Sequence, residues 1–265
     1  MKIFEKPQYA FEIKNNLCSF IAFINDIPAF NNMMGTAFNQ CVPITHLVKN
    51  GENTFKVLVF PLKPATHLQA LSDCFATIIV KDYWDNANAF IEISAMGFPA
   101  GTSNDTIKLP GFELKGTFEA KLPFDDFQWV NAPKLDTNRS TNIDLARRYL
   151  SEIHSAFKEK NTSFLFKEII TREQELSKSF YEEFEIGMEF TQKDFNGTFN
   201  DPNYIIQDLS YEKFLPKLYA DGRIIAFENE NYEQPIFFLN DIEFTRRQYP
   251  FYFCMNKENK MMVIR

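Results

Sequence analysis

Alternation of hydrophobic and polar residues in the first half of the chain predicts short β-strands. The clearest case is "FELKGTFEAKL", residues 112–122, where Phe112 and Leu114 face one way while Glu113 and Lys115 face the other. The alternation resumes beyond Gly116. A glycine inside such a pattern is typical of a β-bulge or a turn, so we expect Gly116 to interrupt the strand.

Turn residues separate at least seven such strands between Tyr9 and Val130. Asn25-Asp26 stands between two apolar runs and predicts a tight reversal, because Asn and Asp tolerate the left-handed backbone of hairpin turns. Almost no helical period occurs in this half. The pattern therefore predicts an N-terminal antiparallel β-sandwich of jelly-roll-like type.

The stretch "VKNGENTFKVLVFPLKP", residues 48–64, places Asn50-Gly51 before an alternating strand that ends at Pro61. It resembles a pattern frequent in jelly-roll and galactose-binding-like sandwiches, including those attached to glycosidases. The resemblance covers about fifteen residues and includes no catalytic motif. In such sandwiches the Gly permits the turn and the Asn ties its backbone, so we expect an architectural role here.

Helical periodicity replaces this pattern after a polar linker at residues 131–142. One apolar stripe follows the 3.6-residue period and predicts a first helix; it consists of Ile143, Ala146, Tyr149, Leu150, Ile153 and Phe157. A second helix is predicted from Ser163 to Ile170, and a capping box at Thr171 starts a third that ends near Phe184. Residues 195–204 are expected to form a loop.

Strand signals return in the last quarter of the chain, in "RIIAFEN", "PIFFLN", "YPFYFCMN" and "KMMVIR". Helices followed by an antiparallel meander predict an α+β domain whose helices pack on the sheet. We therefore expect two domains, a β-sandwich at residues 1–135 and an α+β domain at residues 136–265.

Composition and charge narrow the function. The 265 residues are 45% hydrophobic and carry a formal net charge of −7, which disfavours nucleic acid as a partner because phosphate binding requires a basic surface. No apolar run approaches the ~18 residues of a membrane span. The first residues contain no apolar segment of the kind that a secretory signal requires. We expect a cytoplasmic protein without a membrane partner.

Residues that carry chemistry do not form a known motif. The four cysteines form no CxxC pair, and the three histidines show no metal-ligand spacing. We therefore expect no metal, no cofactor and no catalytic residues, and we expect the cysteines to be reduced, buried thiols. A catalytic dyad of Cys41 with His46 or His67 is a weaker alternative, because such pairs are defined in space rather than along the sequence.

Three groups of residues are candidates for binding. Aromatic residues flanked by acids suit sugar stacking or a protein hot spot, and they occur at Asp82, Tyr83, Trp84 and Asp85, with Trp129 as a further platform. Arg246-Arg247 could clamp a phosphate or carboxylate, although more often one member of such a pair contacts a local Glu while the other is solvated. Residues 180–190 alternate acids with Phe, Ile and Met, which indicates a contact face for a basic protein or the edge of a helix passing into a strand.

These observations favour a non-catalytic protein-interaction protein whose partner is another protein. One form is a cytoplasmic neutraliser of a toxin or other basic partner, because an acidic face steers basic proteins to it. One alternative is a carbohydrate or small-ligand binding module that uses Trp84. The other is an enzyme with an unrecognised site in the C-terminal domain, lined by Arg223, Arg246 or Tyr249.

Overall fold

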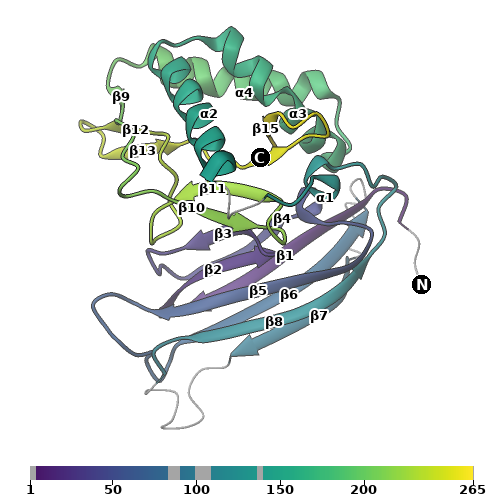
Figure 1. Cartoon of the computed structure of the whole chain (residues 1–265). Coiled ribbons are helices and arrows are strands. Elements are labelled where there is room, and N and C mark those ends of the chain that lie inside the picture. The colour runs from purple at the N-terminus through teal and green to yellow at the C-terminus, as the bar shows by residue number, and fades with distance from the viewer. Residues whose placement is uncertain (1–3, 83–89, 99–108, 136–139, 265) are drawn as a thin grey trace. The chain divides into compact units, whose positions relative to one another are not determined.

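The structure is a computed structural model that describes residues 4–82, 90–98, 109–135 and 140–264. The chain divides into two compact units, residues 1–125 and residues 126–265. Its described part consists mostly of antiparallel sheets, and its four α-helices all begin after residue 127 (Figure 1). The predicted order of strands, then helices, then further strands is confirmed at this level. The compact units divide ten residues before the predicted boundary at 135 (135 − 125 = 10).

Unit 1 contains eight described strands in two antiparallel sheets. Sheet A has the order β4 (Phe38–Pro43), β1 (Pro7–Asn16), β6 (Asp73–Asp82), β7 (Phe90–Phe98). Sheet B has the order β3 (Ile27–Asn32), β2 (Cys18–Ile24), β5 (Gly51–Pro61), β8 (Phe112–Ala120). A short 3₁₀ helix, Thr45–Leu47, precedes β5.

The inner faces of the two sheets share one aromatic core. Phe11 of β1 meets Phe30 of β3 and Phe55 of β5 edge to face, with ring centroids 5.8 and 5.6 Å apart. Every second residue of β5 from Asn53 to Val59 is buried, as the alternation predicts. Full burial of a Phe or Val side chain contributes about 1.5–3 kcal/mol, so this core is the main source of unit 1 stability.

The turn residues behave as local chemistry predicts. Asn25 and Asp26 both have positive φ, 50° and 66°, and close the β2–β3 hairpin. Gly51 has φ +86° and starts β5. The Asn50 side chain accepts from the Leu122 amide at 2.6 Å and donates to the Phe124 carbonyl at 3.0 Å, which is an architectural contact within unit 1.

The predicted interruption at Gly116 was wrong. β8 runs through it, and the pairing with β5 continues in one register from Gly51 to Val59. A Cβ atom at Gly116 would lie 2.6 Å from Cε1 of Phe55. The glycine is therefore required by the close approach of the Phe55 ring rather than by a bulge.

Unit 2 begins with the one-turn helix α1 (Gln128–Asn131) and continues with α2 (Ser140–Lys158). In α2 the predicted stripe is confirmed, since Ala146, Leu150, Ile153 and Phe157 are all buried. Helix α3 (Thr162–Phe180) is a single helix, so the predicted break at Thr171 was wrong.

Helix α4 (Phe184–Asn200) replaces the loop predicted from residue 195. The sequence "FNGTFN" has turn composition, yet Phe195, Thr198 and Phe199 are buried at helical spacing. Burial of two Phe side chains outweighs the cost of about 1 kcal/mol for a glycine in a helix. Residues 180–190 accordingly belong to two helices and their connection, not to a helix that passes into a strand.

Two antiparallel sheets complete unit 2. Sheet C has the order β13 (Thr245–Gln248), β12 (Phe237–Asn240), β9 (Tyr204–Ile206), and sheet D has the order β10 (Leu215–Tyr219), β11 (Ile224–Glu228), β14 (Phe253–Met255), β15 (Met261–Val263). The helices pack against these sheets in one core, where Phe157 of α2 contacts the rings of Phe238 and Phe251. No described helix is long and apolar enough to span a membrane.

Candidate functional site

The hairpin between β12 and β13 presents the most unusual exposed residues of unit 2. Four residues, Asp241 to Phe244, connect the paired ends Asn240 and Thr245. The Asn240 side-chain oxygen accepts from the amides of Ile242 and Glu243, both at 3.1 Å, which fixes the start of the loop. The loop closes at Phe244 with φ +52°. Its backbone is therefore well defined.

Both the backbone conformation and the solvent exposure of Phe244 are unfavourable for a Phe residue. A left-handed backbone costs a residue with a Cβ roughly 1–2 kcal/mol, so Gly or Asn is usual at such a position. The Phe244 side chain is also 93% exposed, and Ile242 is 72% exposed. Neither residue is explained by packing within the chain. Strained residues and exposed apolar groups concentrate at functional sites, so this loop is our candidate contact region.

Sheet C carries further exposed apolar residues close to the loop in the strand pairing. Ile205 of β9 lies directly opposite Leu239 of β12, so the two side chains share the outer face of the sheet. Ile205 is 60% exposed and Leu239 is half-buried. We define the hairpin surface by its apolar residues together with the two acids of the loop: Ile205, Leu239, Asp241, Ile242, Glu243 and Phe244.

The predicted Arg246-Arg247 pair lies at the base of this hairpin, and both members contact residues of unit 2. Arg246 donates to Glu233 at 2.6 Å and lies over the Phe237 ring at 4.1 Å. These contacts match the expectation that one arginine contacts a local Glu. Binding of an anion by the pair stays a prediction, and an anion would have to compete with Glu233.

The expectation that the other arginine is solvated was wrong, because Arg247 contacts helix α4 and strand β9. It donates to the Thr198 hydroxyl at 2.8 Å, forms an ion pair with Asp194 at 3.6 Å and lies 4.7 Å from the centroid of the Tyr204 ring. The hydrogen bond with Tyr204 raises the pKa of the Arg247 guanidinium, which is therefore charged at any physiological pH. Arg247 thus connects α4, β9 and the base of the hairpin.

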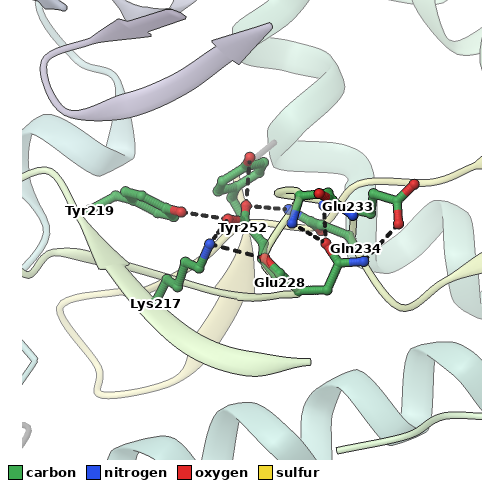
Figure 2. A network of polar contacts seen from close by, with 8 residues as sticks. Lys217, Tyr219, Glu228, Glu233, Gln234 and Tyr252 are labelled. Carbon is green, nitrogen blue, oxygen red and sulfur yellow. Dashed lines mark hydrogen bonds and ion pairs between the residues drawn. The ribbon is translucent and has the colours of Figure 1, made fainter. Parts of the chain in front are cut away.

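A buried polar network orders the segment that leads into β12 (Figure 2). Its centre is Glu228, which is only 1% exposed. One carboxylate oxygen accepts from Tyr219 at 2.5 Å and lies 3.7 Å from Lys217 Nζ. The other accepts from Tyr252 at 3.1 Å and from the Gln234 amide at 3.4 Å. Every carboxylate oxygen of this buried group is therefore satisfied.

The network reaches the hairpin through Gln234. Its side-chain oxygen accepts from the Phe251 amide at 2.5 Å, and its backbone carbonyl accepts from the Gln248 side chain at 2.9 Å. Glu233, the partner of Arg246, is the adjacent residue (Figure 2). The network therefore holds both ends of the β12–β13 hairpin, while the loop itself stays exposed.

Burial sets the electrostatics of the network. It raises the pKa of Glu228, an effect that the donors Tyr219 and Tyr252 oppose, and it lowers the pKa of Lys217. Lys217 also donates to the Asn229 carbonyl at 3.1 Å and lies over the Tyr232 ring at 3.5 Å. A carboxylate with all its acceptor sites occupied is suited to holding strands together rather than to proton transfer with a substrate.

A shallow hollow of about 260 Å³ lies on sheet B of unit 1. Its polar lining includes Lys56 of β5 and Lys115 of β8, which are directly opposite in the pairing register. Lys56 forms an ion pair with Asp26 at 2.9 Å, and Lys115 with Glu113 at 3.1 Å. An anionic ligand would have to displace these carboxylates, so we do not place the candidate site here.

The acid and aromatic candidates of unit 1 are only partly described. Asp82 ends β6 and accepts from the Glu5 amide at 3.3 Å. Tyr83, Trp84 and Asp85 lie outside the described residues. Trp129 belongs to α1 of unit 2; it is 6% exposed and therefore has little surface available for stacking. Binding by these residues stays a prediction.

The residues predicted for a catalytic dyad or for a pocket in the C-terminal domain lie at separate positions in the structure. The expectation that all four cysteines are buried was wrong for Cys41, which is exposed on β4 because its strand lies at the edge of sheet A. His46 lies in the 3₁₀ helix. Among the described residues, no group of three His, Cys, Asp or Glu side chains is placed to hold a metal ion. Tyr249 is buried and shares a hydrogen bond with Thr198 at 2.6 Å, whereas Arg223 pairs with Asp221 at 3.3 Å.

Sequence reasoning missed Ile242 and Phe244. Both residues lie in "NDIEF", residues 240–244, which precedes the arginine pair. A usable signal was present, because Asn240-Asp241 marks a turn and the next residues place two large apolar side chains inside that turn. Turns normally carry polar residues or glycine, so two large apolar side chains there mark the loop as a candidate contact region.

No family model, no curated protein and no solved structure matches this chain.

Proposed function

We propose that this is a non-catalytic protein-interaction protein that binds its partner through the hairpin surface. The observation that carries the proposal is Phe244, which is 93% exposed at a left-handed backbone position. Burial of a Phe side chain in a partner's pocket contributes about 1.5–3 kcal/mol, which offsets the strain of the loop. Aromatic anchors of this kind dominate the energy of protein interfaces.

The proposed partner is a basic protein. Asp241 and Glu243 flank Ile242 in the loop, and the whole chain carries a formal net charge of −7. A complementary partner presents an apolar pocket rimmed by Lys or Arg, because opposite charges at the rim raise the association rate and reject acidic competitors. A neutraliser of a basic toxin is one form of this function.

We also propose how the chain is divided into domains, which fold the first domain has and where the protein acts. The two units are separate domains, which is supported by the enclosed apolar core of each. The N-terminal domain is a jelly-roll-like sandwich, supported by the eight antiparallel strands in two sheets among its described residues. The chain acts in the cytoplasm, in line with the thiol state of all four cysteines.

The test is an affinity capture from the source cells with the tagged full chain and two variants. Phe244→Gly removes the aromatic ring and favours the backbone of the loop. Phe190→Ala is the matched control, because Phe190 is also exposed, at 66%, but lies on α4 outside the hairpin surface. We expect one basic protein to be captured by the unmodified chain and by Phe190→Ala, and to be lost with Phe244→Gly.

The captured protein is then purified and its dissociation constant is measured at two salt concentrations. We expect at least ~10-fold weaker binding for Phe244→Gly, and weaker binding at high salt because rim charges are screened. A bait that returns alone contradicts the proposal. A partner that binds both variants equally well also contradicts it, since the hairpin surface would then be irrelevant to the contact.

A further inference from the structure

Two buried cysteines of unit 1 lie near each other where the chain passes from sheet A to sheet B. Cys18 is the first residue of β2 in sheet B, and Cys74 is the second residue of β6 in sheet A. Both are 0% exposed. The chain between them contains β3, β4 and β5, so the two thiols are distant in sequence and come together only in the folded unit.

The backbone explains how the thiols meet. Asn15, near the end of β1, pairs with Cys74, and the last residue, Asn16, pairs with Asp73. Leu17 then has φ +51° and turns the chain sharply into β2. This turn brings Cys18 Sγ within 3.2 Å of the Asp73 carbonyl oxygen, which belongs to the peptide group that continues into Cys74. Cys18 Sγ therefore lies beside the backbone of Cys74, whose side chain is also buried.

The two thiols are not equivalent. The hydrogen bond from Cys74 lowers the pKa of the Cys18 thiol, and the Asn15 amide, 4.0 Å from the sulfur, acts in the same direction. The same thiol–thiol contact, together with burial, raises the pKa of Cys74. Only Cys18 has the contact from the Asn15 amide, which favours a negative charge on its sulfur, and the thiolate is the form that attacks a disulfide.

We propose that Cys18 and Cys74 form a reversible disulfide site whose oxidant is a low-molecular-weight disulfide such as oxidised glutathione. The Cys18 thiolate attacks one sulfur of the oxidant, forms a mixed disulfide and releases one glutathione thiolate. Cys74 then loses its proton and attacks the Cys18 sulfur, which releases the second glutathione. The two protein thiols are oxidised, and the oxidant is reduced to two glutathione thiols.

The bond would link sheet A to sheet B at one end of the core. It would close the loop from residue 18 to residue 74, and long closed loops restrict the unfolded chain most. Since both sulfurs are fully buried, the reaction requires either local opening at the Leu17 turn or oxidation during folding. Disulfide formation would therefore regulate the stability of unit 1.

The experiment uses the full chain with Cys41→Ser, which removes the exposed thiol. The protein is refolded from urea in a buffer of reduced and oxidised glutathione, and the same preparation refolded with excess reductant is the control. Peptides from a digest without reductant are then identified by mass spectrometry. We expect one linked pair that contains Cys18 and Cys74, lighter by two hydrogen atoms, which separates on reduction.

The linked protein is expected to melt about 5 °C or more above the reduced protein, and the difference is expected to vanish on adding reductant. Folded protein with unmodified Cys18 and Cys74 overturns the proposal. So does a stable glutathione adduct on either cysteine, or a pairing with Cys254. The peptide map requires no substitution of Cys18 or Cys74. The test therefore does not depend on whether such variants fold.

Discussion

The Tyr219 hydroxyl donates to the buried Glu228 carboxylate at 2.5 Å, and this contact joins β10 to the last residue of β11. Replacement of Tyr219 by Phe leaves the carboxylate with one donor fewer in a site that water does not reach. We expect the free energy of unfolding to fall by about 1.5–3 kcal/mol, the range for a hydrogen bond to a charged group. Urea denaturation followed by circular dichroism measures it.

A double-mutant cycle with Glu228→Gln separates this contact from general packing. Because the hydroxyl acts on the carboxylate, the two replacements together should cost at least ~1 kcal/mol less than the sum of the single losses. Additive losses would show that Tyr219 and Glu228 stabilise the fold independently, contrary to the network in Figure 2.

Phe244→Gly is expected to leave the protein at least as stable as before, with a gain of up to about 1 kcal/mol. The left-handed backbone at φ +52° strains any residue with a Cβ, and the 93% exposed ring contributes almost no packing. Phe238→Ala in β12, the strand that leads into the loop, is the contrast. It removes a buried ring and should lower the free energy of unfolding by about 3–5 kcal/mol. A loss above 1 kcal/mol for Phe244→Gly would mean that the ring packs on the chain.

Gly116→Ala is expected to destabilise unit 1 by about 1–3 kcal/mol, since the new methyl group would lie 2.6 Å from the Phe55 ring and force it to move. Lys115→Ala is the control. It changes the adjacent residue, whose side chain is 76% exposed, and should alter stability by less than about 0.5 kcal/mol. Thermal unfolding of the three proteins tests the prediction, and equal melting temperatures would refute the steric explanation.

The raised pKa of Glu175 in α3 predicts that the stability of the folded protein depends on pH. Burial raises the pKa of this half-buried carboxyl from 4.5 to about 7, although the Gln128 amide donates to it at 2.5 Å. The folded state therefore binds a proton more tightly than the unfolded state. The stabilisation is complete below pH 4.5 and is lost as the pH rises through about 7.

Glu175→Gln keeps the acceptor for Gln128 and removes the charge. We expect it to match the unmodified protein near pH 4.5 and to exceed its free energy of unfolding by roughly 1–2 kcal/mol at pH 8. Glu189→Gln is the control of opposite sign, because the Lys193 ammonium lowers the pKa of Glu189. Urea titrations across this pH range measure both, and parallel curves for Glu175→Gln and the unmodified protein would contradict the prediction.

Much of the fold was predictable because it depends on local chemistry. Asn25-Asp26 predicted a hairpin turn that both residues form with positive φ, and the stripe from Ala146 to Phe157 predicted the buried face of α2. Helix α4 was not predictable in the same way. Its residues 195–200 have turn composition, and only the burial of Phe195 and Phe199 against the rest of unit 2 makes the helix favourable.

The candidate site was also predictable only where it depends on local sequence. The sequence placed Arg246 and Arg247 together, but their separate partners, Glu233 and Asp194, come from segments that only folding brings near. The apolar residues of the hairpin loop were equally visible in the sequence. Their significance depended on exposure, which is set by what packs against a side chain rather than by its neighbours along the chain.

The sequence by itself determined the order of strands and helices, the acidic charge and most of the turns, because periodicity and turn chemistry act over a few residues. The tertiary structure alone decided that Cys18 lies beside the Asp73–Cys74 peptide group, that Glu228 is enclosed by tyrosines and that Phe244 is left uncovered. Each of these depends on segments distant in the chain, and no local pattern encodes which of them come into contact.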